Sequence, residues 1–175
     1  VLLRGNGPKA FCAGGDVLQL VQACREQPGQ IPELARRFFA DEYRLDYRIH
    51  TYPKPLICWA HGYVMGGGMG LMQGASIRIV TPSSRLAMPE ISIGLFPDVG
   101  GGWYLSRLEG RVGRYLALSG ARIDGADCAV LGLATHYLNA ESLAEAKARI
   151  AEAPERTEGI LGQLASAPPE AKLLT

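Results

Sequence analysis

Residues 55–70, PLICWAHGYVMGGGMG, constrain the fold of this chain more than any other stretch. The first part, residues 56–60, is a short apolar run typical of a strand that is covered on both faces. A glycine triplet follows at residues 66–68. Its backbone N–H groups can approach a ligand closely at the start of a predicted helix, where negative charge is favoured. The stretch therefore predicts a buried strand, a glycine-rich turn that opens a helix, and a site for a group that is or becomes anionic.

The composition is that of an ordinary globular domain. The chain has 175 residues, 47% hydrophobic and 20% charged, which is enough to bury one core. Eighteen basic residues against 17 acidic ones give a net charge of +1, so a nucleic-acid partner is not expected. No apolar run approaches the roughly 20 residues that span a bilayer, and no signal peptide is visible, so no membrane partner is expected.

The cysteines and histidines predict no metal site. The four cysteines form no CxxC pair, and the three histidines lack HExxH or HxH spacing. Isolated thiols of this kind favour a reducing compartment.

Residues 9–16, KAFCAGGD, predict a second junction of strand, glycine turn and helix. This junction can also present N–H groups to a ligand, or it can simply connect core elements.

Residues 31–52 predict one long helix, with Phe38 and Leu45 on its apolar stripe. Glu42 falls on the same stripe, at i+4 from Phe38 and i−3 from Leu45. Because an unpaired buried charge is costly, Glu42 either faces a cavity or lies at the edge of the stripe as a surface acid.

Two further acids, Glu90 and Asp98, each follow a proline in a glycine-rich loop region. Carboxylates held on such loops are candidates for acid/base or nucleophilic chemistry, or they cap the loops.

Downstream, Gly120 is expected to end a helix over residues 112–119, and Asp124 to cap a helix over residues 125–132. The alternation of strands and helices predicts an α/β fold.

Five motifs, in this order, resemble those of the crotonase (enoyl-CoA hydratase/isomerase) superfamily, whose members act on acyl-coenzyme A thioesters. Within it they are most similar to the motifs of 3-hydroxyisobutyryl-CoA hydrolases. The motifs are KAFCAGGD (residues 9–16), FADEY (39–43), HGYVMGGGMG (61–70), AMPE (87–90) and GLFPDVGGG (94–102). The resemblance implies a crotonase-like α/β fold of ββα repeats around a spiral core. It implies a single domain over 1–175, with a core at 1–138 and a C-terminal helical region at 139–175.

Family members usually carry an earlier strand and a longer C-terminal helical region. We therefore expect this chain, which starts inside a strand-like segment, to be truncated at both ends.

The resemblance also assigns the site. It implies an oxyanion hole formed by the N–H groups of Gly15 and Gly67, and it implies catalysis by Glu90 and Asp98. The substrate-binding positions that it implies are Ala13, Asp16, Glu42, Gly67, Glu90 and Asp98. No metal and no separate cofactor are implied, because coenzyme A is part of the substrate.

Gly70 separates the branches of the superfamily. Enoyl-CoA hydratases have a glutamate two positions after the glycine triplet, and it pairs with the glutamate that corresponds to Glu90. Without that acid, the expected reaction is hydrolysis of 3-hydroxyisobutyryl-CoA in valine catabolism.

Two alternatives stay open: an enoyl-CoA hydratase or isomerase, and a non-catalytic acyl-CoA-binding homologue. The resemblance further implies a homo-oligomer, expected to be a trimer. The expected location is the cytoplasm, or the mitochondrial matrix in a eukaryote.

Overall fold

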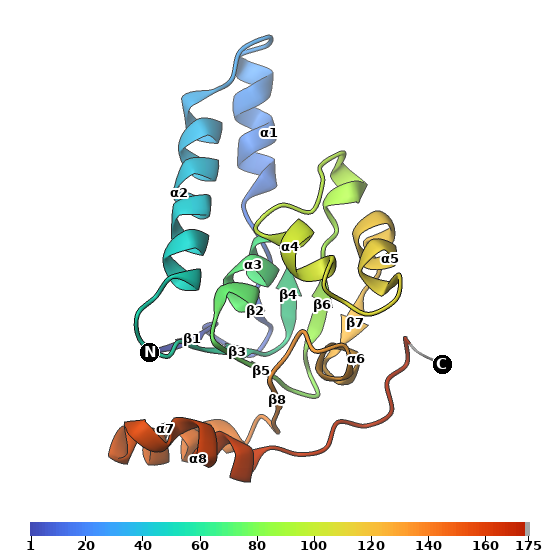
Figure 1. Ribbon diagram of the computed structural model, residues 1–175. Helices are drawn as coiled ribbons and strands as arrows, with labels where there is room; N and C mark the ends of the chain where they lie inside the picture. Colours follow the sequence, from blue (N-terminus) through green and yellow to red (C-terminus); the bar gives the residue numbers. More distant parts are fainter. Residues whose placement is uncertain (174–175) are drawn as a thin grey trace.

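The computed structural model describes residues 1–173 and confirms the predicted α/β architecture. Two four-stranded sheets form its centre (Figure 1). The first sheet is parallel throughout, and its strands in spatial order are β1 (Leu2–Arg4), β3 (Ile57–Ala60), β5 (Ile77–Val80) and β8 (His136–Tyr137).

The second sheet has three parallel strands and one antiparallel edge strand. In spatial order these are β2 (Ala10–Cys12), β4 (Tyr63–Met65), β6 (Arg85–Ala87) and the antiparallel β7 (Ile123–Asp124). Successive strands along the chain alternate between the sheets, so β1, β3 and β5 enter the first sheet while β2, β4 and β6 enter the second. A helical segment follows each pair, because parallel neighbours need a crossover connection. This is the predicted spiral of ββα repeats.

The stretch at residues 55–70 differs from its prediction in one respect. The buried strand β3 does not lead directly into the glycine turn, because β4 intervenes and belongs to the other sheet. Gly62, at a φ of +59°, redirects the backbone between the two strands, in a conformation that side chains with a β-carbon rarely adopt. The glycine turn therefore follows a strand of the second sheet.

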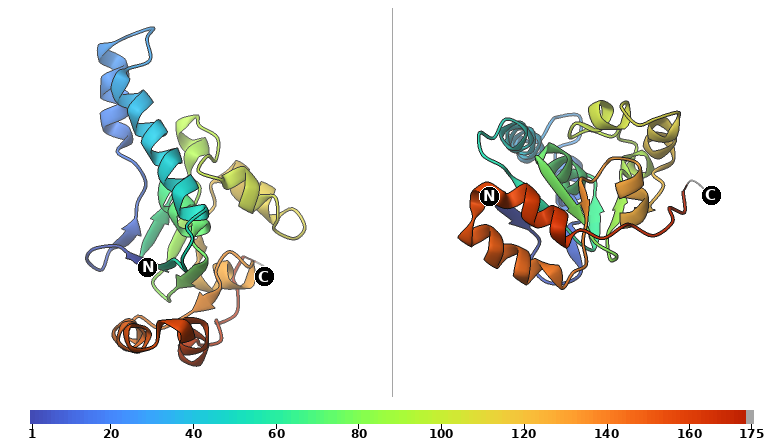
Figure 2. Two further views of the ribbon diagram at one scale, coloured as in Figure 1. Left: turned by 60° about the vertical axis from the view of Figure 1, so that its left-hand side comes forward. Right: turned by 60° about the horizontal axis from the view of Figure 1, so that its bottom comes forward.

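The helices surround the sheets unevenly. The helices α1 (Val17–Glu26) and α2 (Glu33–His50) form a hairpin that projects beyond the sheets in both figures that show the whole chain (Figures 1 and 2). The elements nearer the sheets on this side are α3 (Gly67–Gly74), the 3-10 turn η1 (Glu90–Ile93), α4 (Gly101–Leu105) and α5 (Val112–Ser119). Only the base of the hairpin is packed, since Ile49 is the one buried residue of α2 and α1 has none.

The core has two parts. The larger packs α3, α4 and α5 with side chains of both sheets, from Phe11 to Tyr137. The smaller lies between the first sheet and the C-terminal helices (Figure 2). The C-terminal elements are α6 (Gly125–Val130), α7 (Ser142–Glu152), the 3-10 turn η2 (Pro154–Arg156) and α8 (Thr157–Leu164). No helix within residues 1–173 is long and apolar enough to cross a membrane.

Candidate active site

A cavity of about 300 Å³ opens where α2, the glycine turn before α3, and the loop that contains η1 meet. Three carboxyl groups line it, those of Glu42, Glu90 and Asp98. Most of the remaining wall is apolar, and its side chains include Val17, Leu20, Phe38, Phe39, Ile93 and Leu95. A small apolar cavity with a few convergent polar groups is the usual form of a small-molecule site.

Six of the seven predicted site residues line this cavity: Ala13, Gly15, Glu42, Gly67, Glu90 and Asp98. Asp16 does not. Its carboxylate accepts a hydrogen bond from the Gln19 N–H at 3.1 Å and so caps the N-terminus of α1. The chain therefore folds residues that are up to 85 positions apart in the sequence around one space, with Asp16 just outside it.

Glycines at positions 66 and 67 allow two carboxylates to approach the N-terminus of α3. A β-carbon added to Gly66 would lie 2.7 Å from Oε1 of Glu90, and one added to Gly67 would lie 2.5 Å from Oε1 of Glu42. Any side chain at either position would displace an acid. The two glutamates therefore face the start of α3, where the backbone N–H groups favour negative charge.

Two backbone N–H groups at the cavity are free to bind a ligand. Within the described part of the chain, neither Gly15 nor Gly67 donates its N–H in a backbone hydrogen bond, and Gly67 is the first residue of α3. The Gly14 segment runs close to this turn, since a β-carbon built on Gly67 would lie 4.0 Å from the Gly14 α-carbon. The tip of the Phe38 ring of α2 fills the place of a β-carbon at Gly15, so a side chain there would displace the ring.

Glu90 is the most buried of the three acids. It begins η1, is 6% exposed, and its Oε2 atom has no hydrogen-bond partner within residues 1–173. Burial raises the pKa of Glu90, and the negative charge of Asp98 raises it further. A carboxyl group whose pKa is raised in this way takes up a proton more readily than an exposed glutamate, which suits it to proton transfer.

Glu42 is also perturbed. Burial, followed by the charges of Asp98, Asp46 and Glu90, raises the pKa of Glu42 from 4.5 to about 7. Of the two readings of its place on the helix stripe, the structure supports the one in which the helix passes a cavity. Perturbed acids grouped in a cleft are typical of catalytic sites.

Asp98 is held by a residue that the sequence did not single out. The Tyr43 hydroxyl donates a hydrogen bond to Oδ2 of Asp98 at 2.7 Å. Tyr43 directly follows Glu42, so one turn of α2 supplies both a cavity acid and the group that orients another. The only signal in the sequence was the FADEY motif itself, which does not reveal a partner 55 residues away.

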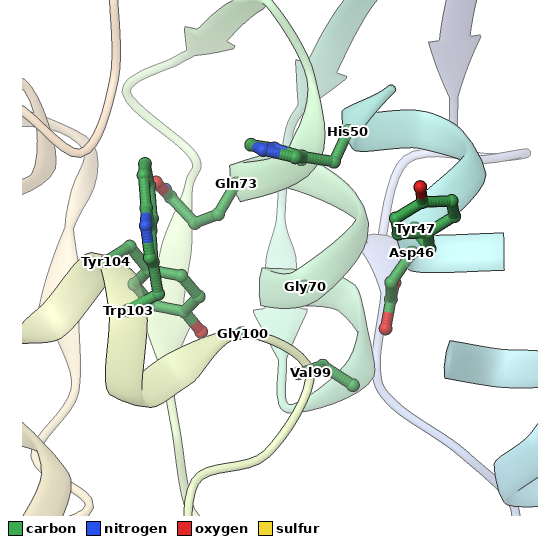
Figure 3. Close-up of a pocket in the computed structure, with 10 residues that line it drawn as sticks. Asp46, Tyr47, His50, Gly70, Gln73, Val99, Gly100, Trp103 and Tyr104 are labelled. Atoms are coloured by element: carbon green, nitrogen blue, oxygen red, sulfur yellow. The ribbon is translucent and has the colours of Figure 1, made fainter. Parts of the chain in front are cut away.

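Gly70 does not line the cavity that holds the acids. It lines a neighbouring pocket of about 250 Å³ between α2, α3 and α4, opposite Asp46 and beside Val99 (Figure 3). Both carboxylate oxygens of Asp46 are buried and lack a hydrogen-bond partner among the described residues. Burial and the Asp98 charge raise the pKa of Asp46 from 3.8 to about 6. Sequence patterning could have indicated Asp46, because it lies four residues after Glu42 on the same helix face.

Within residues 1–173, no three histidine, cysteine, aspartate or glutamate side chains are grouped so that they could hold a metal ion.

Comparison with known proteins places this geometry in a family. Residues 1–173 match the family model described as "Enoyl-CoA hydratase/isomerase". The chain is 45% identical over 143 residues to the mitochondrial 3-hydroxyisobutyryl-CoA hydrolase of Danio rerio, and 44% identical over 144 residues to that of Homo sapiens. Each match covers 82% of this chain and 36% of the relative. A third relative, the small ribosomal subunit protein mS47 of Neurospora crassa, is 42% identical over 156 residues, 89% of this chain and 30% of its own length.

Solved structures agree with this result. A carnitinyl-CoA dehydratase from Mycobacterium thermoresistibile superposes with a TM-score of 0.88 at 40% identity, and an enoyl-CoA hydratase from Rhodobacter sphaeroides with a TM-score of 0.83 at 36% identity. Each match covers 99% of this chain and 49% of the other. The chain thus spans 30% to 49% of the length of these relatives, and its fold matches that of the two solved structures over that span. The chain belongs to the enoyl-CoA hydratase/isomerase family, the crotonase superfamily.

Proposed function

We propose that the protein hydrolyses a short branched 3-hydroxyacyl-CoA thioester, 3-hydroxyisobutyryl-CoA, to the free acid and coenzyme A in valine catabolism. The observation that carries this proposal is the pair of glutamates, Glu42 and Glu90, at the glycine turn before α3, in the same cavity as the unbonded N–H groups of Gly15 and Gly67. The relatives named 3-hydroxyisobutyryl-CoA hydrolase support the choice of substrate. The small apolar cavity suits a short acyl group.

The proposed reaction uses charge development on the thioester oxygen. When water attacks the carbonyl carbon, that oxygen becomes negative, and the N–H groups of Gly15 and Gly67 stabilise it. Losing one such donor typically costs about 3 kcal/mol in the barrier. The intermediate then expels the thiolate as the carbon–sulfur bond breaks.

Glu90 has the proton-transfer role. As a general base it removes a proton from the attacking water and later gives a proton to the departing sulfur, so that acid and thiol form with no change in its own charge. As a nucleophile it would instead attack the carbonyl carbon itself, and water would then cleave the resulting anhydride. Both routes need a carboxylate at this position. We assign to Asp98, whose carboxylate accepts a hydrogen bond from Tyr43, the binding of the substrate hydroxyl.

Hydration is the second candidate, because the two solved structures above are a dehydratase and a hydratase. Against it stands Gly70. The resemblance assigns a glutamate to this position in hydratases, and here the position carries no carboxylate and lies outside the cavity of the acids. A hydratase would lack half of its acid/base pair.

A thiol-release assay with 3-hydroxyisobutyryl-CoA and a thiol-reactive dye tests the proposal. We expect free coenzyme A from the wild-type protein and a loss of 100-fold or more in kcat for Glu90→Gln, because proton transfer of this kind contributes about 10²–10⁴-fold. Glu33→Gln, a change at an exposed acid at the start of α2, is the matched control and should retain the wild-type rate.

The same assay separates the alternatives. No thiol release above background would contradict hydrolysis. Loss of enoyl absorbance from crotonyl-CoA without free thiol would indicate a hydratase. Tight binding of an acyl-CoA with no turnover of either substrate would indicate a non-catalytic binding homologue.

Two further properties are part of the proposal. We expect a homotrimer, which sedimentation of the purified protein would test. We also expect the mitochondrial matrix if the source is a eukaryote, since the hydrolase relatives are named as mitochondrial, and otherwise the cytoplasm.

A further inference from the structure

Val99 occupies the space that a side chain at position 70 would need. A β-carbon added to Gly70 would overlap the Val99 β-carbon, and it would lie 2.8 Å from Cγ2 and 3.0 Å from the carbonyl oxygen of Val99. The contacts with the two Val99 side-chain atoms are shorter than real β-carbons show, and the contact with the backbone oxygen is tight. Position 70 therefore accepts glycine only while Val99 stays where it is, beside the turn of α3 that carries Gly70 (Figure 3).

Val99 is held in an unusual backbone conformation. Its φ is +41°, and among the described residues it is the one non-glycine residue with a positive φ. For a β-branched residue this is strained, so the surroundings must impose it. Two features hold Val99 in this conformation. Its side chain is 7% exposed in the larger core, and a hydrogen bond from the Gly101 N–H to the Asp98 carbonyl oxygen, at 2.6 Å, closes the turn over residues 98–101.

This turn sends two adjacent side chains in different directions. Val99 enters the core against α3, whereas Asp98 lines the cavity of the acids and accepts the hydrogen bond from Tyr43. If Val99 moved away from α3, the α-carbon of Asp98 would move with it. The packing of Val99 against Gly70 thus affects the position of the Asp98 carboxylate.

We propose that Gly70 is a positioning and specificity-determining residue: the missing β-carbon seats Val99 against α3, and the seated Val99 fixes Asp98 at the cavity. This inference rests on the proposed function. It gives Gly70 a positive role. An acid at position 70 and Asp98 in its present place exclude each other, so converting this chain to a hydratase requires changes at both positions 70 and 99.

The first test measures kcat and KM for 3-hydroxyisobutyryl-CoA in Gly70→Ala, Val99→Gly and the double variant. We expect Gly70→Ala to lower kcat at least tenfold. Val99→Gly removes the obstructing β-carbon, and a glycine adopts the φ of +41° without strain, so that in the double variant the backbone of Asp98 can return to its place. The kcat of the double variant should therefore recover at least fivefold over Gly70→Ala. Gly74→Ala is the matched control, since it adds a methyl group to the same helix against Ile49 and not Val99, and its kcat should stay within twofold of wild type.

A double-mutant cycle with Asp98→Asn tests whether the effect passes through Asp98. If it does, Asp98→Asn lowers kcat strongly in wild type and by less than twofold in Gly70→Ala. Three results would each overturn the proposal. The first is a wild-type kcat for Gly70→Ala, and the second is that Gly70→Ala and Asp98→Asn lower kcat by independent, multiplicative factors. The third is that Val99→Gly does not restore the kcat of Gly70→Ala. If Gly70→Ala fails to fold, the double variant must fold and melt at a higher temperature, and failure to do so also overturns it.

A structural measurement keeps this inference separate from the proposed function. Crystal structures of the wild-type protein, Gly70→Ala and the double variant give the distance from the Tyr43 hydroxyl to Asp98 Oδ2. This measurement does not depend on turnover. We expect hydrogen-bond distance in wild type and a separation beyond 3.5 Å in Gly70→Ala. An unchanged distance overturns the positioning role, even for a protein that proves to have no hydrolase activity.

Discussion

Four carboxyl groups, those of Glu42, Asp46, Glu90 and Asp98, share two adjoining spaces, and His50 is the one potentially cationic side chain that lines either space within the described residues. Such a group cannot carry four full negative charges at low cost, because each charge disfavours the next. Burial is the largest cause of the raised pKa values of Glu42, Asp46 and Glu90, and the charges of the neighbouring carboxylates raise them further. The cluster therefore holds protons near neutral pH, and its charge state belongs to the group as a whole.

This charge state predicts how stability changes with pH. The pKa of Asp46 is about 6 in the folded protein, against an ordinary value of 3.8, so the folded state binds the proton more tightly than the unfolded state. The contribution of Asp46 to stability is therefore most favourable below about pH 4 and is lost as the pH rises through about 6. Asp46→Asn removes this loss. We expect the difference in the free energy of unfolding between Asp46→Asn and wild type to increase, in favour of the variant, by on the order of 1 kcal/mol from pH 4.5 to pH 8. This figure allows for solvent screening of the partly exposed carboxylate.

Urea unfolding at a series of pH values measures the effect. The control is Asp41→Asn on the same helix, where the aspartate is exposed and pairs with Arg44 at 3.2 Å. Its stability should follow the wild-type curve. Parallel curves for Asp46→Asn and wild type would show that Asp46 does not carry the unfavourable charge.

Helix ends were the elements most accessible from sequence, because they depend on a few local residues. Asp124 was predicted to cap the helix that follows it. Its Oδ1 accepts hydrogen bonds from the N–H groups of Ala126 at 2.9 Å and Asp127 at 3.0 Å, and the Asp127 carboxylate accepts in return from the Asp124 N–H at 3.2 Å. The predicted cap of α6 is confirmed, as is Gly120 at the left-handed end of α5.

Removing this cap should weaken the fold measurably. Asp124→Ala leaves two N–H groups at the start of α6 unbonded and also removes the contact with Lys172 at 3.4 Å. We expect a loss of about 1–2 kcal/mol in the free energy of unfolding. Thermal unfolding by circular dichroism checks this, with Asp124→Asn as the conservative variant that should retain most of the stability. A loss below about 0.3 kcal/mol in Asp124→Ala would contradict the capping role.

Other elements could not be predicted because their cause is distant in the sequence. The strand β4 has three residues between glycines, and only its pairing with β2 and β6 makes it a strand. The same holds at the site. Glu42 was found from helix periodicity and the glycine turns from composition, whereas the bond from Tyr43 to Asp98 and the seat of Val99 on Gly70 exist only in the folded chain. Local patterns predicted the elements and the acids, but not the contacts that orient them.

At the scale of the whole molecule, the C-terminal helices decide whether the chain is one cooperative unit. Leu161 of α8 is fully buried with Trp59 of β3 and Ile79 of β5, on the face of the first sheet that lies away from the larger core. Both cores thus share the strands of one sheet. The predicted division into residues 1–138 and 139–175 is therefore expected to mark two regions of one domain, which unfold together.

The two tryptophans of the chain allow this to be tested. Trp59 is 2% exposed in the smaller core, whereas Trp103 is 52% exposed on α4. Trp103→Phe therefore leaves Trp59 as the only tryptophan, and excitation at the red edge of the absorption band reports on it rather than on the tyrosines. In this background, Leu161→Ala should cost about 2–5 kcal/mol, because it opens a cavity in a fully packed site. Leu118→Ala, at a side chain that is 67% exposed, should cost less than about 0.5 kcal/mol.

Two unfolding signals decide whether the chain is one cooperative domain. In that case Leu161→Ala shifts the urea midpoints of Trp59 fluorescence and of far-ultraviolet circular dichroism by the same amount, because the strands of the first sheet contact both cores and unfold with both. A fluorescence transition that moves alone, ahead of the helix signal, would show instead that residues 139–175 detach as a separate unit while the ββα core stays folded.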